Sequence, residues 1–305
     1  MKQIILIVSL LLEGMFLYGQ SGKPMSQYPS PMRETVRAHE RVPQGPFSGY
    51  HYKIKALFPK PIDVYVPLKT TKSRKANLLI HFFGGSHVVP YAAEHYHGRL
   101  VAVTVNLGAG SSVYARPFSD STLFNRLLDS VQSVITENLH HDIRFNHILV
   151  SGFSAGYGAV RALLGYGQSF SRIDAVLLLD GMHADYIPDR KTLAAGGKID
   201  SAAYENFLNF CREAVKKHGE KRFLFTHSEI FPGTFVSTTE SADYLLNMLD
   251  LHAHPVLKRG PLGMQQISQV RKNHFEIMGF AGNSGPDHID HLQGLSYFLN
   301  WLGKL

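Results

Sequence analysis

Short, continuous apolar runs alternate with amphipathic segments along most of this 305-residue chain, and this alternation is what most constrains its fold. Continuous apolar runs are typical of strands that are buried on both faces of a parallel sheet. The segments between them repeat apolar residues at intervals of three and four, as amphipathic helices do. This pattern predicts an α/β fold, with a mostly parallel central sheet and helices on both of its faces.

The predicted elements form one uninterrupted series. An antiparallel pair of strands at 48–59 and 62–68 begins it. Buried strands are predicted at 76–83, 100–107, 147–152, 175–180, 222–227 and 275–282. Helices are predicted from about residue 120 to 139 and at 155–167, 202–219, 241–251 and 287–305. Because no linker or internal repeat separates these elements, we expect a single domain over residues 48–305.

Residues 1–20 have the pattern of a secretory signal peptide, with a basic Lys2, an apolar centre and a small Gly19 before polar residues. The alternative is a retained membrane anchor. The apolar run is short and contains Glu13, whereas a spanning helix needs about 20 apolar residues. We therefore expect cleavage, no stable membrane insertion afterwards, and a secreted or periplasmic protein. The Pro-rich residues 21–47 are predicted to be an extended leader on the domain.

Composition excludes several classes of protein. The single cysteine, Cys211, rules out an intramolecular disulfide framework and a Cys-rich metal site. The formal net charge is +7, but the basic residues are scattered, so we expect no nucleic-acid partner. Closely spaced histidines occur, yet no HExxH pattern accompanies them. We expect no metal and no organic cofactor.

Residues 152–156, Gly-Phe-Ser-Ala-Gly, match the pattern G-x-S-x-G. The pattern is weak by itself, but here a predicted strand precedes it and a predicted helix follows it. A nucleophilic serine sits on such a sharp turn, and crowding by neighbouring elements leaves room only for glycine on either side. We predict that Ser154 is a nucleophile. The alternative is a solvent-facing serine on an ordinary glycine-rich turn.

Three features together resemble the α/β-hydrolase superfamily, on its branch of serine esterases and lipases. They are the motif around Ser154, the segment His-Phe-Phe-Gly-Gly at 81–85 after an earlier strand, and a histidine at the start of the last helix. The resemblance covers about residues 48–305. It implies an α/β-hydrolase fold and a serine hydrolase that cleaves a small-molecule or polymeric carboxylic ester through an acyl-enzyme. The predicted signal peptide adds that this enzyme is secreted. We expect no large cap domain, because the excursion at 181–200 is too short to form one.

The resemblance orders the catalytic residues as serine, acid and histidine, with the histidine after the last strand. Two histidines, His288 and His291, are found there. We prefer His288 as the base because it lies nearer the end of the strand. His291 lies about one helical turn further and is expected to pack or to form a hydrogen bond.

The catalytic acid has two candidates. Glu229 follows the strand at 222–227, where the superfamily usually carries its carboxylate, and it is the preferred residue. Asp180 closes the strand at 175–180, a position that some lipases use instead. Each residue also has an ordinary interpretation, Glu229 as a surface charge and Asp180 as part of a turn.

Stabilising a tetrahedral intermediate requires two donors that form an oxyanion hole. The backbone amide of Ala155, next to the nucleophile, is predicted to be one. The second is predicted to be the amide of Phe83 or Gly84, because residues 81–85 resemble the HGGG-type loop of the superfamily. Two phenylalanines stand where glycine is common in that loop. His81 is expected to orient the loop.

Residues 181–200 form the longest excursion between the later elements and are interpreted as a small lid. Two other kinds of function remain open. The same catalytic residues serve peptidases and acyltransferases, and a non-catalytic envelope binding protein keeps the fold without the reaction. A metal-dependent hydrolase built on the paired histidines is a third alternative. A carboxylate within reach of His288 favours the enzyme over the binding protein.

Overall fold

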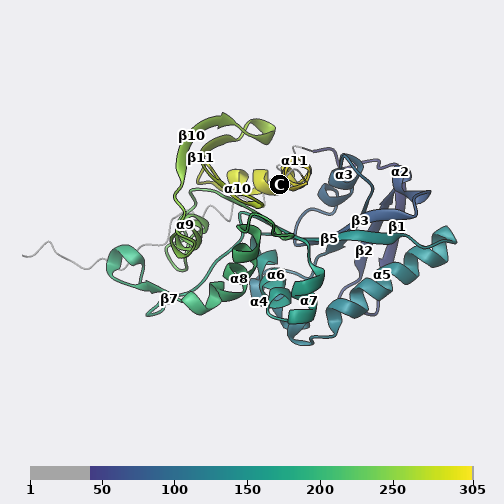
Figure 1. Cartoon of the computed structure of the whole chain (residues 1–305), viewed down its shortest axis with the longest axis horizontal. Coiled ribbons are helices and arrows are strands. Elements are labelled where there is room, and N and C mark those ends of the chain that lie inside the picture. The colour runs from purple at the N-terminus through teal and green to yellow at the C-terminus, as the bar shows by residue number, and fades with distance from the viewer. Residues whose placement is uncertain (1–41, 304–305) are drawn as a thin grey trace, which may run out of the picture.

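A ten-stranded sheet runs through the centre of the computed structural model, which describes residues 42–303 (Figure 1). Its strand order is β1-β2-β4-β3-β5-β6-β9-β12-β11-β10. The predicted signal peptide and most of the predicted leader lie outside the described residues. Within residues 42–303 we find no helix with the length and hydropathy that a membrane-spanning segment requires.

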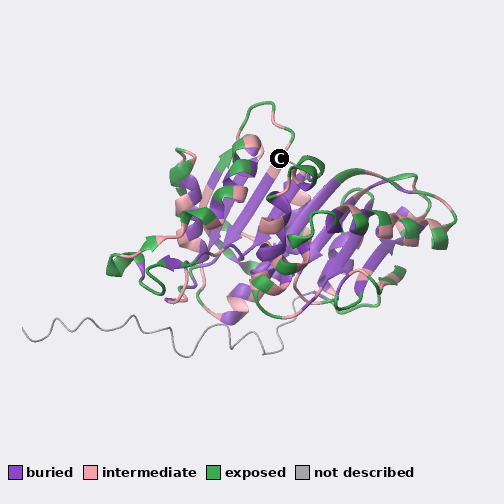
Figure 2. Ribbon diagram, turned by 90° about the horizontal axis from the view of Figure 1, so that it is seen from below, coloured by how far each residue is buried: buried purple, intermediate pink, exposed green. Residues whose placement is uncertain are grey.

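Six neighbouring strands of this sheet are parallel, which confirms the predicted fold class. Their bounds are β3 (Lys75–Phe82), β4 (Leu100–Val105), β5 (Arg144–Phe153), β6 (Ala175–Leu179), β9 (Arg222–His227) and β12 (Phe275–Phe280). β1 (Gly49–Ile54) and β2 (Ile62–Pro67) pair antiparallel at one edge, as predicted. Every residue of β4, β6 and β12 is buried, in keeping with continuous apolar runs that are covered on both faces (Figure 2).

Strand alternation divides the core into two layers. Leu78 and Ile80 of β3 belong to one cluster, while Leu79 between them belongs to the other. The first layer includes residues from α5 (Leu123–Leu139), α6 (Tyr157–Leu164), α8 (Glu205–Ala214) and α9 (Thr238–Met248). The second includes residues from α3 (Val88–Glu94), α10 (Gly285–Gln293) and α11 (Leu295–Leu302). Figure 1 shows α3, α10 and α11 on one side of the sheet and α5, α6 and α8 on the other.

The structure differs from the predicted elements in three places. β10 (His254–Arg259) and β11 (Gln265–Lys272) extend the sheet beyond β12 as an antiparallel hairpin that is largely exposed, so its strands are polar and form no apolar run. The predicted helix at 287–305 is two helices, α10 and α11, which meet at Gly294. The predicted lid contains a short hairpin, β7 (Tyr186–Ile187) with β8 (Lys198–Ile199).

Candidate active site

Ser154 lies on a sharp turn between β5 and α6. It begins a short 3-10 turn, Ser154–Gly156, and its φ of 46° is in the left-handed region that non-glycine residues rarely adopt. Gly156 makes this turn possible, because a Cβ atom there would lie 2.1 Å from the carbonyl oxygen of Phe82 on β3. The strand-to-helix turn predicted from the sequence is therefore present, held against the neighbouring strand.

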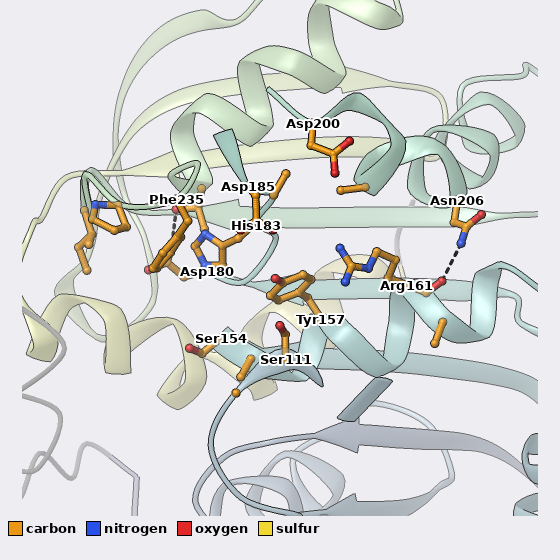
Figure 3. A pocket seen from close by; sticks show the side chains of 18 of the residues that line it. Ser111, Ser154, Tyr157, Arg161, Asp180, His183, Asp185, Asp200, Asn206 and Phe235 are labelled. Atoms are coloured by element: carbon orange, nitrogen blue, oxygen red, sulfur yellow. Dashed lines mark hydrogen bonds between the residues drawn. The ribbon is translucent and has the colours of Figure 1, made fainter. Parts of the chain in front are cut away.

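A cavity of about 750 Å³ opens at this turn, at the carboxyl ends of the parallel strands. Ser154 is only 8% exposed, and the part that is exposed lines this cavity together with Ala155 and His288. Figure 3 shows Ser154 and Ser111 on one side of the cavity, with His183 and Phe235 across from them. Crevices at the carboxyl ends of strands are where open α/β sheets bind ligands.

His288 and Asp180 form a buried pair beside the serine. The Nδ1 atom of His288 donates a hydrogen bond of 2.7 Å to Oδ2 of Asp180. Asp180 follows β6 directly, and His288 lies in the first turn of α10, whose N-terminus is fixed by a capping box between Ser284 and Asp287. Two elements far apart in the sequence thus bring the carboxylate and the imidazole together.

Three further donors surround the carboxylate of Asp180. Its Oδ1 accepts hydrogen bonds from the Ser228 amide at 2.9 Å and from Oγ1 of Thr238 at 2.7 Å, and its Oδ2 accepts one from Oγ of Ser228 at 2.7 Å. Burial alone raises the pKa of Asp180, but the neighbouring His291 and His288 and these donors outweigh it and hold that pKa well below its usual range. Asp180 is therefore a fixed negative charge behind His288.

Glu229, the preferred acid of the sequence analysis, does not contact His288. It is exposed in the loop after β9, where its Oε2 accepts a hydrogen bond of 3.1 Å from the amide of Gly282. Its own amide donates to the carbonyl of Gly282 at 2.9 Å. The physical reason is the direction of successive side chains after β9. Ser228 points inward to Asp180, so the next residue points out to solvent.

His291 is buried one helical turn after His288. Its Nδ1 lies 2.8 Å from Oγ1 of Thr226, and its ring packs edge-on against Phe280. Burial lowers the pKa of His291 to about 4, so its imidazole is neutral near neutral pH. His291 therefore packs and forms a hydrogen bond, and of these two histidines it is His288 that lines the cavity.

The Nε2 atom of His288 is available for proton transfer. It is buried, and no hydrogen-bond partner for it is found among residues 42–303. Because Nδ1 donates its proton to Asp180, Nε2 of the neutral ring carries the free lone pair. Bonds between nucleophile and base are often long before substrate binds, so the absence of a Ser154–His288 bond is compatible with proton transfer between them.

The second oxyanion donor predicted from residues 81–85 is not free in this structure. The amide of Phe83 donates to the carbonyl of Val105 at 3.1 Å, and the amide of Gly84 donates to Oδ1 of Asn106 at 3.0 Å. Neither Phe83 nor Gly84 lines the cavity. The Phe83 amide continues the pairing of β3 with β4, and the Gly84 amide is bound by the side chain of the residue that follows β4. The segment therefore ends a strand instead of presenting its amides to the cavity.

His81 holds this segment from within. Its Nε2 donates a hydrogen bond of 2.9 Å to the carbonyl of Phe83, and its Nδ1 lies 2.6 Å from Oγ of Ser151. Burial lowers the pKa of His81 to about 4, which keeps the imidazole neutral.

The other predicted oxyanion donor, the amide of Ala155, is differently placed. Ala155 lines the cavity, and its amide belongs to the first turn after β5, where backbone N–H groups lack intrahelical partners.

Sequence reasoning missed several residues of the site. Ser228 and Thr238, which hold Asp180, gave no pattern, because hydroxyl side chains near strand ends are common. His183 lies between the rings of Tyr157 and Phe235, and its Nδ1 donates to the carbonyl of Val236 at 2.8 Å. Its position three residues after Asp180 is the one sequence signal that could have identified it.

The predicted lid forms a wall of the cavity opposite α6. The segment between β6 and α8 contributes several residues to this wall, which are His183, Ala184, Asp185, Asp200, Ala202 and Ala203. Within residues 42–303, no group of three or more His, Cys, Asp or Glu side chains is arranged to hold a metal ion.

Comparisons with known proteins bear on the fold. No family profile matches the sequence, and no curated protein does either. An S-formylglutathione hydrolase from Agrobacterium tumefaciens has a similar structure over 85% of this chain and 96% of its own, with a TM-score of 0.50 at 13% sequence identity.

Two other solved structures are similar over comparable lengths. An arylesterase is 16% identical and matches over 87% of each chain, with a TM-score of 0.46. Est1E from Butyrivibrio proteoclasticus is 9% identical over 85% of this chain and all of its own, with a TM-score of 0.43. Together with the strand order and the turn at Ser154, the similarity to the S-formylglutathione hydrolase identifies the architecture: this chain has the α/β-hydrolase fold that esterases of this kind share.

Proposed function

We propose that this protein is a serine-dependent hydrolase of carboxylic esters that works through an acyl-enzyme. The observation that carries the proposal is the arrangement in one cavity of Ser154, on its strained turn, and the hydrogen-bonded pair His288–Asp180. A serine hydroxyl needs a base to take its proton, and the base needs a group that fixes its tautomer. Ser154, His288 and Asp180 are suited to these roles of nucleophile, base and tautomer-fixing group, respectively.

In the proposed reaction, Oγ of Ser154 attacks the ester carbonyl carbon while Nε2 of His288 takes the hydroxyl proton. The resulting tetrahedral oxyanion collapses, the bond to the leaving oxygen breaks, and His288 returns the proton to the departing alcohol. Water then attacks the acyl-enzyme by the same steps and releases the acid. Asp180 stays ionised throughout and stabilises the imidazolium that forms twice in each cycle.

Two groups in the cavity are suited to the oxyanion. The amide of Ala155 is one, as the position after the nucleophile suggests. We assign the other to the hydroxyl of Ser111, for which no partner is found in the described part of the chain. Ser111 is packed against the first turn of α6, since a Cβ on Gly158 would lie 2.2 Å from the carbonyl oxygen of Ser111. In this proposal the hydroxyl of Ser111 takes the role that the sequence analysis gave to the amide of Phe83 or Gly84.

The wider setting of this activity is also a proposal. The pattern of residues 1–20 supports secretion or export to the periplasm, so the substrate is a small-molecule or polymeric ester met outside the cytoplasm. The segment between β6 and α8 forms part of the cavity wall but is too short to form a cap domain over the cavity. An uncapped cavity suits a substrate that extends out of the site.

Labelling with a fluorophosphonate tests the nucleophile. We expect the wild-type protein to be labelled, Ser154→Ala to be unlabelled, and the control Ser133→Ala on the exposed face of α5 to be labelled like wild type. A panel of esters, amides and acyl acceptors then separates an esterase from a peptidase or an acyltransferase. A folded wild-type protein that takes no label would overturn the hydrolase mechanism and favour a binding protein of the same fold.

A further inference from the structure

Arg161 is a positively charged residue in the cavity that the proposed reaction does not use. It lines the cavity from α6, the helix that begins at the nucleophile turn. Within residues 42–303, no carboxylate oxygen lies within 4.0 Å of its guanidinium, and no side-chain hydrogen bond of Arg161 is found. A guanidinium carries five N–H donors, and a half-buried one without acceptors is suited to bind an acceptor from a ligand.

The guanidinium and the backbone of Arg161 each contact a residue that lines the cavity. It lies over the ring of Tyr157, 5.5 Å from the ring centroid, in the geometry of a cation–π contact. Asn206 of α8 donates a hydrogen bond of 3.0 Å to the backbone carbonyl of Arg161, which ties the end of α6 to the cavity wall. Figure 3 shows Arg161 between Tyr157 and Asn206, with its charged end directed into the cavity.

Besides Asp180, which is paired with His288, two acidic residues line the same cavity without forming an ion pair with Arg161. Asp185 is exposed, so solvent screens its charge. Asp200 caps a 3-10 turn, because its Oδ1 accepts a hydrogen bond from the amide of Ala202. Neither forms an ion pair with Arg161. The guanidinium thus remains the unpaired charge at this end of the cavity.

Arg161 lies farther from the reacting bond than Tyr157 does. Tyr157 and Arg161 are four residues apart on α6, a spacing that places side chains in a row on one face of a helix. Four residue steps along a helix span about 6 Å. Figure 3 shows Tyr157 between Ser154 and Arg161, so a group held by Arg161 would lie beyond Tyr157 from the ester carbonyl at Ser154.

We propose that Arg161 binds a carboxylate on the substrate, at the end remote from the scissile ester. The planar fork of a guanidinium matches the two oxygens of a carboxylate, and such charge-assisted pairs are stronger than neutral hydrogen bonds. This inference rests on the proposed ester hydrolysis and adds its substrate class, which is the half-ester of a dicarboxylic acid or an equivalent anionic ester. Tyr157 supplies an apolar surface for the chain between the two ends.

Paired substrates test this assignment. The 4-nitrophenyl monoester of suberic acid, whose extended chain is longer than the stretch of α6 from Tyr157 to Arg161, is compared with the same ester carrying a terminal amide. The readout is the ratio of kcat/KM for the anionic ester to that for the neutral one. We expect wild type to favour the anionic ester about 10- to 100-fold. The chain of the corresponding succinate pair is shorter than the roughly 6 Å of helix from Tyr157 to Arg161, so its ratio should stay near one.

Variants identify the residue responsible. Arg161→Gln should bring the suberate ratio to about one, and Arg161→Lys, which keeps the charge but not the fork, should give an intermediate ratio. Arg172→Gln is the matched control, because Arg172 is exposed on α7 and bonds to Asn125 away from the cavity. It should behave as wild type. A wild-type ratio near one, or a ratio that Arg161→Gln leaves unchanged, overturns the inference while ester hydrolysis itself stands.

A binding measurement separates this inference from the catalytic proposal. Calorimetry on the Ser154→Ala protein with suberamic acid, which carries the carboxylate and the amide but no ester, needs no turnover. If wild type hydrolyses none of the esters, the proposed function fails. Binding of suberamic acid that Arg161→Gln abolishes then still supports the carboxylate site, and binding that does not depend on Arg161 overturns it.

Discussion

At the scale of single residues, the site depends on which carboxylate stands behind His288. The two candidate acids follow neighbouring strands, and the pattern of apolar residues could not distinguish them, because both positions lie at the same edge of the sheet. Only the directions of the side chains decide the matter. Ser228 and Thr238 donate to Asp180 and complete its hydrogen bonding, while Glu229 is used to close a loop at Gly282.

Replacing each carboxylate by its amide tests this pairing. Asp180→Asn should lower kcat for a simple ester by about 10³- to 10⁴-fold, because the amide neither fixes the tautomer of His288 nor stabilises its charged form. Glu229→Gln should change kcat by less than about threefold, since that side chain is exposed. Steady-state kinetics on both variants provide the comparison. A larger loss in Glu229→Gln than in Asp180→Asn would contradict the assignment.

At the scale of elements, buried strands were predicted well and exposed ones were not. The six parallel strands coincide with apolar runs because both of their faces are covered. The hairpin β10–β11 has few buried residues, so its sequence carries no comparable signal. The failure of Phe83 and Gly84 as donors has a similar origin, since a motif does not reveal where a strand stops pairing. Only their partners, the backbone carbonyl of Val105 and the side chain of Asn106, show that these two amides are already used.

The turn at Ser154–Gly156 leads to a prediction at the scale of elements. Gly156→Ala should destabilise the protein by more than about 2 kcal/mol, because the new Cβ would collide with the carbonyl of Phe82 on β3, which cannot move freely. Gly167→Ala at the start of α7 is the matched control, since nothing lies within 4 Å of a Cβ there. It should leave stability unchanged or slightly increased. Urea unfolding followed by circular dichroism gives both values, and equal stabilities for the two variants would show that the turn is not crowded.

At the scale of the whole molecule, the two core layers enclose several histidines that stay neutral. His81 and His291 are fully buried, and burial lowers the pKa of each to about 4. The same side chains have a pKa of about 6.5 in an unfolded chain. Below that pH the unfolded state binds protons that the folded state does not, so the folded state loses stability as the pH falls.

The expected result is a free energy of unfolding that is flat above about pH 7 and falls between about pH 6.5 and 4. Each of these two histidines contributes about 3 kcal/mol to the full decrease. Denaturant unfolding at a series of pH values measures it. His291→Gln should flatten the profile, while His252→Gln, at an exposed site just before β10, should leave its slope as in wild type. A wild-type profile without this slope would mean that these imidazoles are protonated in the folded protein.

The way the cavity is built has a consequence for how its chemistry can change. The side that carries Ser154 and His288 comes from strand ends, the turn before α6 and the first turn of α10, and a Cβ on Gly156 would collide there with Phe82. Much of the opposite wall comes from the segment between β6 and α8, whose hairpin β7–β8 lies outside the main sheet. Under the proposed function, substitutions in that segment would alter which ester is accepted while Ser154 and His288 keep their positions. Arg161 differs from this wall, because it lies on the helix that follows Ser154, so the anionic end of the substrate would be recognised from the same stretch of chain that carries the proposed nucleophile.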